Sequence, residues 1–142
     1  YNDLKRESKT EVVFDWNEIL NMEGNSGPYL QYTYARIQSV LGKSKKKTFD
    51  KFDSTELNED ETNILRVFIR YSEVIEAAAK NYSPNILCNY LYLLAQKYNG
   101  FYNKHKIVGG ENEDFKLTLT ASTGQILGNG LKLLGIKAPD RM

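Results

Sequence analysis

The sequence predicts an all-α fold: a bundle of four to five helices preceded by an irregular N-terminal lead-in. The strongest observation is a run of apolar residues at helical spacing from Leu87 to Phe101. Ser83-Pro84 pairs a capping residue with a proline, and Gly27-Pro28 offers a similar helix start. No segment after residue 28 shows the alternation of a β-strand. The length of 142 residues suits one domain with a single core.

The chain is expected to divide into a lead-in, residues 1–22, and a helical domain, residues 23–142. The lead-in combines a β-rich group at 12–14 with a helical turn and turn-forming residues. Because the sequence starts at Tyr1 rather than at methionine, we expect a piece of a longer protein, with the lead-in as the tail of a preceding region. The first clear helix should run from Pro28 to about Leu41, capped by Ser26 or Gly27.

A solvated loop is expected to separate the first two helices of the domain. It begins with the lysine-rich run 43–47 and continues into acidic residues, a pattern that resists packing. The second helix is predicted to begin at Asn58, where Glu61 completes a capping box. Ser72 offers a cap for a short continuation over residues 73–80.

The last helix is predicted over residues 113–134, with Gly135 at the position that favours a helix C-terminal glycine. Glycine inside a helix costs up to ~1 kcal/mol relative to alanine. We therefore expect the glycines of this helix to permit close approach of a neighbouring helix: Gly124, Gly128 and Gly130.

Composition is that of a soluble globular protein, with 41% apolar and 26% charged residues. The net charge of +1 excludes a domain-wide attraction to nucleic acid or to an anionic membrane, so a basic surface would have to be local. No apolar run approaches the ~20 residues of a membrane span. The single cysteine, Cys88, excludes a disulfide framework and is expected to be buried. We expect a cytoplasmic monomer with no membrane partner.

Catalytic and metal-binding constellations are missing from the sequence. His105 is the only histidine, which excludes a multi-histidine zinc site or relay. Neither a phosphate-binding P-loop nor a G-x-S-x-G elbow is present. Pairing of Cys88 with His105 is disfavoured because the cysteine lies on or beside an apolar stripe. We therefore predict no catalytic centre, no metal site and no cofactor in this chain.

The segment GPYLQYTYAR, residues 27–36, is rich in tyrosine. On a helical wheel, Tyr34 joins an apolar stripe about 60° wide and is predicted to be buried with Leu30, Ile37 and Leu41. Tyr29, Tyr32 and Arg36 share another sector, about 130° away.

Two interpretations of the second sector remain open. Its tyrosines can pack against another segment, since tyrosine is amphipathic. Alternatively, the two rings and the guanidinium form a platform for unstacked RNA bases, with nearby lysines contacting phosphates. A helical scaffold that uses exposed aromatic residues to bind another protein is a further alternative.

Three segments carry a resemblance to a known family. EGNSGPYLQYTYAR, residues 23–36, resembles the segment that opens the C-terminal domain of arginyl-tRNA synthetases. NYLYLLAQKYNGFYN, residues 89–103, and QILGNGLKLLGIKAPDRM, residues 125–142, resemble two later helices of that domain in the same order. The chain is thus similar to the helical anticodon-binding domain called DALR. The related domain of another class I synthetase, such as the cysteine enzyme, matches the first and last segments less well.

The resemblance implies an arginine–tRNA ligase whose full-length form uses ATP and Mg²⁺ to attach arginine to tRNA(Arg). The catalytic domain would lie in another part of the protein, and this piece alone would not aminoacylate. It also implies an anticodon-binding site, whose expected partner is the tRNA(Arg) anticodon loop. By position the candidate residues are Tyr29, Tyr32, Arg36 and Met142, followed by Phe101, Tyr102, His105, Lys43, Lys45 and Lys46.

This sequence departs from the family pattern in its last helix. Gly124 stands where the family often has arginine, and Gly128 replaces a residue that is commonly larger. The DALR tetrapeptide itself is not visible. These departures concern the surface contacts of the last helix rather than its fold.

Overall fold

The computed structural model describes residues 1–7, 10–11, 15–22, 24–44 and 56–142, and these form an all-helical domain. A short helix in the lead-in is followed by five longer ones, which confirms the predicted fold class. The helices are α1 (Trp16–Ile19), α2 (Gly27–Lys43), α3 (Glu59–Ile69), α4 (Tyr71–Lys80), α5 (Pro84–Lys104) and α6 (Glu113–Leu133).

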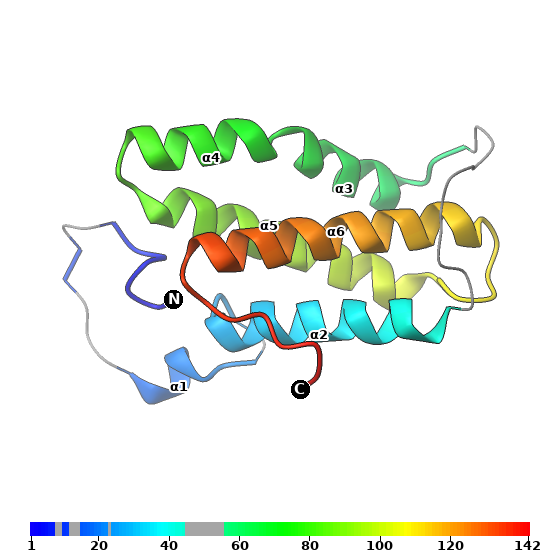
Figure 1. Cartoon of the computed structure of the whole chain (residues 1–142), viewed down its shortest axis with the longest axis horizontal. Coiled ribbons are helices and arrows are strands. Elements are labelled where there is room, and N and C mark those ends of the chain that lie inside the picture. Colours follow the sequence, from blue (N-terminus) through cyan, green and yellow to red (C-terminus); the bar gives the residue numbers. More distant parts are fainter. Residues whose placement is uncertain (8–9, 12–14, 23, 45–55) are drawn as a thin grey trace.

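Figure 1 shows α3 and α4 following one another along one edge of the bundle and α2 along the opposite edge, with α5 and α6 between them. The segment after α6 turns back and crosses α2, so the C-terminus lies against the first long helix (Figure 1). Helices α2 and α6, far apart in sequence, are packed together, as are α5 and its neighbours on both sides.

The helix starts confirm two capping predictions. The Ser26 hydroxyl accepts a hydrogen bond from the Tyr29 backbone N–H at 3.2 Å, and Pro28 occupies the first turn. Asn58 and Glu61 form a reciprocal capping box, with N···O distances of 2.9 and 3.0 Å. These caps satisfy donors that have no partner inside the helix.

Three local predictions are corrected by the structure. Ser72 does not cap a helix, because α4 already begins at Tyr71, directly after Arg70. The hydroxyl of Ser83 precedes α5 as expected, but it donates to the Asn81 carbonyl rather than capping the helix. Helix α2 continues past Gly42 to Lys43. The β-rich group predicted at 12–14 lies outside the described residues.

The lead-in is held against the helical domain by polar contacts. The Tyr1 hydroxyl donates to the side chain of Asn25 at 2.5 Å and lies 3.2 Å from the Cys88 carbonyl oxygen. The Lys5 ammonium donates to the Asn25 carbonyl at 2.8 Å. Desolvation raises the pKa of the Tyr1 hydroxyl above its usual value, so this group stays protonated and available as a donor.

The core is a single apolar cluster to which α2, α3, α4, α5 and α6 all contribute. Cys88 is fully buried, as predicted, and burial raises the pKa of its thiol to about 11. Such a thiol is a small hydrophobe rather than a nucleophile at neutral pH. The largest fully buried side chains include Leu30, Ile37, Ile64, Leu91, Leu94, Tyr98, Phe101, Leu117, Leu127 and Leu131.

The glycines of α6 let neighbouring side chains reach the helix backbone, as predicted. A Cβ at Gly124 would lie 2.7 Å from the Ile37 Cγ2, and one at Gly130 would lie 2.4 Å from the Leu91 Cδ2. Both distances are shorter than van der Waals contact. Helix α6 therefore approaches α2 and α5 with bare backbone at these points.

Replacing Gly130 with alanine is expected to lower the free energy of unfolding by about 1–3 kcal/mol, since the added methyl overpacks the core against buried Leu91. The gain in helix propensity, up to ~1 kcal/mol, offsets only part of this cost. Urea unfolding measures the change. Gly100→Ala is the matched control, because a Cβ at Gly100 in α5 meets nothing within 4 Å. Equal stability of the two variants would contradict the packing role of Gly130.

Candidate nucleic-acid interface

Helix α2 packs against both α5 and α6. The burial of its tyrosines therefore differs from the helical-wheel prediction. Thr33 is completely buried, and its hydroxyl accepts a hydrogen bond from Asn99 of α5 at 2.9 Å. Ile37, also completely buried, contacts the backbone of α6 at Gly124. The buried sector of α2 is therefore wider than a single apolar stripe.

Tyr29 is half-buried between α2 and α5 instead of standing on an open face. Its ring packs edge-on against Tyr92, with centroids 5.5 Å apart and planes at 63°. Its hydroxyl accepts a hydrogen bond from the Asn99 amide at 2.9 Å. Tyr29 is therefore engaged with α5 through both its ring and its hydroxyl.

Tyr34 is only partly buried, which corrects its assignment to the core. It packs at the edge of the apolar cluster, where its ring lies over Gly128. A Cβ at Gly128 would lie 3.0 Å from the Tyr34 Cε2. The predicted core partner Leu41 is likewise half-buried, whereas Leu30 and Ile37 are fully buried as expected.

Arg36 lies between two aromatic rings from different helices. Its guanidinium carbon is 4.8 Å from the ring centroid of Tyr32 and 4.8 Å from that of Tyr102. One guanidinium nitrogen, Nη1, donates to the Asn99 side-chain oxygen at 2.7 Å. Cation–π attraction to both rings and a hydrogen bond thus hold a planar cation in place.

Asn99 connects this cation to the helix interface. The side-chain oxygen accepts from Arg36, while the nitrogen donates both to the Tyr29 hydroxyl and to the Thr33 hydroxyl. Asn99 was not among the site residues predicted from the sequence. A signal was present, because Tyr92, Asn99 and Tyr102 recur at intervals of seven and three residues, which places them on one face of α5 beside its apolar stripe.

A pocket of about 820 Å³ opens beside Arg36, and we call it the Arg36 pocket. Helix α2, Tyr102 of α5 and the last three residues of the chain all line it. Among the described lining residues the charged side chains are Arg36, Lys43, Arg141 and Asp140, three cationic and one acidic. The structure therefore brings together five of the predicted site residues: Tyr32, Arg36, Lys43, Tyr102 and Met142.

Three predicted residues do not line the Arg36 pocket: Tyr29, described above, Phe101 and His105. Phe101 is completely buried in the core, so no base can reach its ring. His105 packs on that buried ring, with centroids 5.1 Å apart, and its Nε2 is 3.0 Å from the Asp60 carboxylate. Hydrogen bonds from His105 and Lys104 lower the pKa of Asp60 below its usual value. His105 therefore ties α5 to the start of α3. Lys45 and Lys46 lie outside the described residues.

Comparison with known proteins identifies the family of this chain. A family model described as the DALR anticodon binding domain matches residues 30–142. The chain belongs to the DALR anticodon-binding domain family. The Arg36 pocket of this DALR domain lies wholly within the matched residues.

The DALR domain is similar in sequence to arginine–tRNA ligases. It is 39% identical over 147 residues to the ligase of Pasteurella multocida and 37% identical over 149 residues to that of Parabacteroides distasonis. Both alignments cover the whole of this chain. The chain spans about a quarter of the length of these relatives, 26% and 25% respectively.

Solved structures of arginyl-tRNA synthetases share the fold of the DALR domain. The enzyme of Thermus thermophilus superposes with a TM-score of 0.90 at 30% identity, covering 98% of this chain and 25% of that chain. The putative enzyme of Campylobacter jejuni gives a TM-score of 0.86 at 31% identity, covering 98% of this chain and 32% of that chain.

None of the described helices has the length and apolar character that crossing a membrane requires. No group of three or more His, Cys, Asp or Glu side chains in the described ranges is arranged to hold a metal ion.

Proposed function

We propose that this DALR domain recognises the anticodon loop of tRNA(Arg), and that the Arg36 pocket receives an anticodon base. The observation that carries the proposal is the fixed guanidinium of Arg36, held between Tyr32 and Tyr102 at a pocket rich in cations. Single-stranded RNA loops are commonly recognised by planar side chains that stack on splayed bases and by donors that pair with base edges. Family membership and the names of the similar proteins support the same conclusion.

The genetic code indicates which base the pocket should select. Every arginine codon has guanine in its second position, so every arginine anticodon has cytosine in the middle, while its other two letters vary. Stacking on Tyr32 or Tyr102 tolerates any base, because every base has a π-face. Selection of cytosine then requires polar groups that meet the base edge. The guanidinium of Arg36 and the polar groups of the segment 140–142 line the pocket and are positioned to supply them.

For the whole protein we propose arginine–tRNA ligase activity with ATP and Mg²⁺. The support is that the relatives matched by this chain are named arginine–tRNA ligases, while the chain spans only about a quarter of their length. The catalytic domain, with the sites for ATP and Mg²⁺, would lie in the remainder of the protein. We propose that the protein acts as a cytoplasmic monomer and that this chain contributes tRNA binding.

The test is to compare two RNA stem-loops, one with an arginine anticodon and one in which uracil replaces the middle cytosine. Uracil has an acceptor where cytosine has an amino donor, so we expect binding to weaken by about 5- to 150-fold, the equivalent of about 1–3 kcal/mol for a mispaired base edge. Fluorescence anisotropy at fixed ionic strength measures the affinities. A stem-loop with one inverted stem base pair is the control and should bind normally.

Equal affinity for the cytosine and uracil loops would overturn the anticodon assignment. The salt dependence of binding separates RNA recognition from the alternative of a protein-binding scaffold. Contacts with phosphates release counterions, so affinity for the stem-loop should fall as salt rises.

A further inference from the structure

A second pocket, of about 810 Å³, lies between α2, α6 and the segment after α6. We call it the α2–α6 pocket. Tyr34 and Gln38 line it from α2, while Gln125 and Asn129 line it from α6. Its volume is in the range of ordinary small-ligand sites, which is about 300–1,000 Å³. No residue of the predicted anticodon site lines it.

Bare helix backbone forms part of the wall of the α2–α6 pocket. Gly124 and Gly128 line it, and a side chain at either position would collide with Ile37 or with the Tyr34 ring. Ile37 and the Tyr34 ring therefore fill the space that these side chains would occupy, and the Tyr34 ring is held against Gly128 at the pocket. Gly124 and Gly128 are also two of the points at which the sequence departs from the family pattern.

Three side-chain amides line the α2–α6 pocket. Within the described part of the chain, the carboxamides of Gln38, Gln125 and Asn129 make no hydrogen bonds. Each carboxamide offers both a donor and an acceptor, the combination that pairs with the edge of a nucleobase. The Tyr34 ring beside them provides an aromatic surface for stacking.

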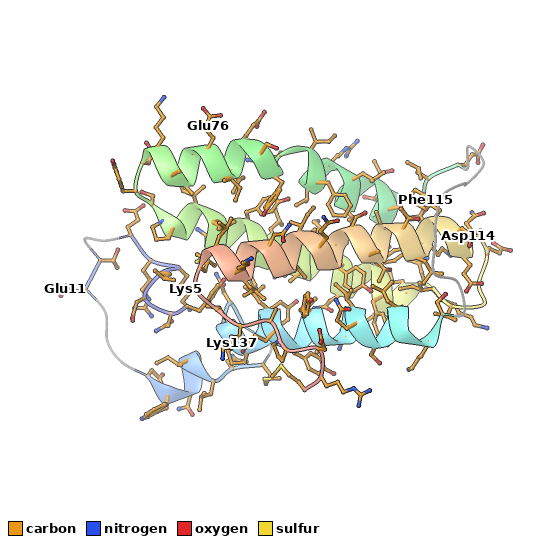
Figure 2. All side chains as sticks on the ribbon, in the orientation of Figure 1. Lys5, Glu11, Glu76, Asp114, Phe115 and Lys137 are labelled. Atoms are coloured by element: carbon orange, nitrogen blue, oxygen red, sulfur yellow. The ribbon has the colours of Figure 1, made fainter. Side chains whose placement is uncertain are left out.

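The charges around the α2–α6 pocket favour an anionic ligand such as an RNA strand. Lys132 and Lys137 line it, and none of the described lining residues is acidic. Figure 2 shows Lys137 on the segment that follows α6, beside α2. This segment is anchored there, because the Gln31 amide donates to the Lys137 carbonyl at 2.7 Å.

The two pockets adjoin along the same stretch of chain. Gln38 lines both of them. Lys137 and Ala138 line the α2–α6 pocket, and residues 140–142 line the Arg36 pocket. An RNA strand with one base in the Arg36 pocket can therefore follow this segment into the α2–α6 pocket.

We propose that the α2–α6 pocket binds a second unstacked nucleobase of the same RNA loop, with its ring against Tyr34 and its edge on the carboxamides. The proposal rests on the proposed function of the Arg36 pocket. It assigns to this chain a contact with a nucleotide other than the middle cytosine.

The test pairs a scan of the RNA with a variant of the pocket. Each loop nucleotide of the stem-loop is made abasic in turn, and binding is measured to the unmodified chain and to the double variant Gln125→Ala, Asn129→Ala. Both side chains are exposed, so the fold should be retained. Asn103→Ala is the matched control, because Asn103 is an exposed amide on α5 that lines neither pocket.

With the unmodified chain, we expect an abasic middle position and one further abasic position each to weaken binding by about 5- to 150-fold, the effect of losing one stacked base. In the double variant, the loss of binding free energy caused by the further abasic position should fall to less than about half of its value with the unmodified chain. The loss caused by the abasic middle position should persist. Asn103→Ala should keep both penalties. Such coupling between one nucleotide and one pair of side chains is what a double-mutant cycle isolates.

The outcomes separate the two proposals. Unchanged penalties at every position in the double variant would overturn the second base site while leaving the Arg36 pocket intact. If the unmodified chain is indifferent to the middle base, the proposed function fails, and this inference fails with it.

Discussion

Replacing Arg36 with alanine is expected to weaken binding of the arginine-anticodon stem-loop by about 30- to 150-fold, because a charge-assisted contact worth about 2–3 kcal/mol is lost. Removal of the guanidinium also opens the slot between Tyr32 and Tyr102, so the rings lose the group that orders them. The measurement is stem-loop affinity, with urea unfolding alongside to show that the domain remains folded.

Two further variants decide whether charge or geometry causes this loss. Arg66→Ala removes the same charge from an exposed position on α3 and should leave affinity within about twofold of the unmodified value. Arg36→Lys keeps the charge but not the planar group, so it should recover less than half of the lost binding free energy. If Arg66→Ala weakens binding as much as Arg36→Ala, net charge explains the result and the pocket does not.

The neighbouring aromatics Phe101 and Tyr102 are expected to respond in opposite ways to alanine. Phe101→Ala should lower the free energy of unfolding by about 3–5 kcal/mol, since a fully buried ring is removed from the core. Tyr102→Ala should cost much less stability, because the ring is only partly buried. Instead it should weaken stem-loop binding by about 5- to 150-fold through the loss of one stacking surface.

Stability is measured by urea unfolding and affinity by anisotropy at a temperature at which each variant is folded. The contrast is decisive because the two residues are adjacent on α5. A folded Phe101→Ala variant that loses binding as strongly as Tyr102→Ala would contradict the separation of core and pocket.

The sequence predicted the helix starts well because their causes are local. Ser26 and Asn58 each meet a backbone N–H three residues along the chain, so the capping pattern is visible in a short window. The boundary between α3 and α4 was predicted at Ser72 but lies at Arg70, which makes no side-chain cap and so leaves no local signal of the change. Composition and hydrophobic periodicity were sufficient to predict the all-helical fold.

The candidate site was predicted less completely because its residues meet across the bundle. A wheel drawn for one helix assumes one buried direction, whereas α2 faces both α5 and α6. Thr33 is consequently buried despite its hydroxyl, while Tyr34 sits at the edge of the core. The convergence of Tyr32, Arg36 and Tyr102 required knowledge of how α2 and α5 are aligned.

The three hydrogen bonds of Asn99 also set the rotational register of α2 against α5. A slide of one residue along α2 would turn its side chains by about 100° and carry Tyr29, Thr33 and Arg36 away from Asn99. Apolar side chains at the same interface can exchange one neighbour for another at modest cost, but a carboxamide left without partners there incurs the penalty of an unsatisfied polar group. One polar side chain thus discriminates between alternative alignments of two helices, and it keeps Arg36 in a single position.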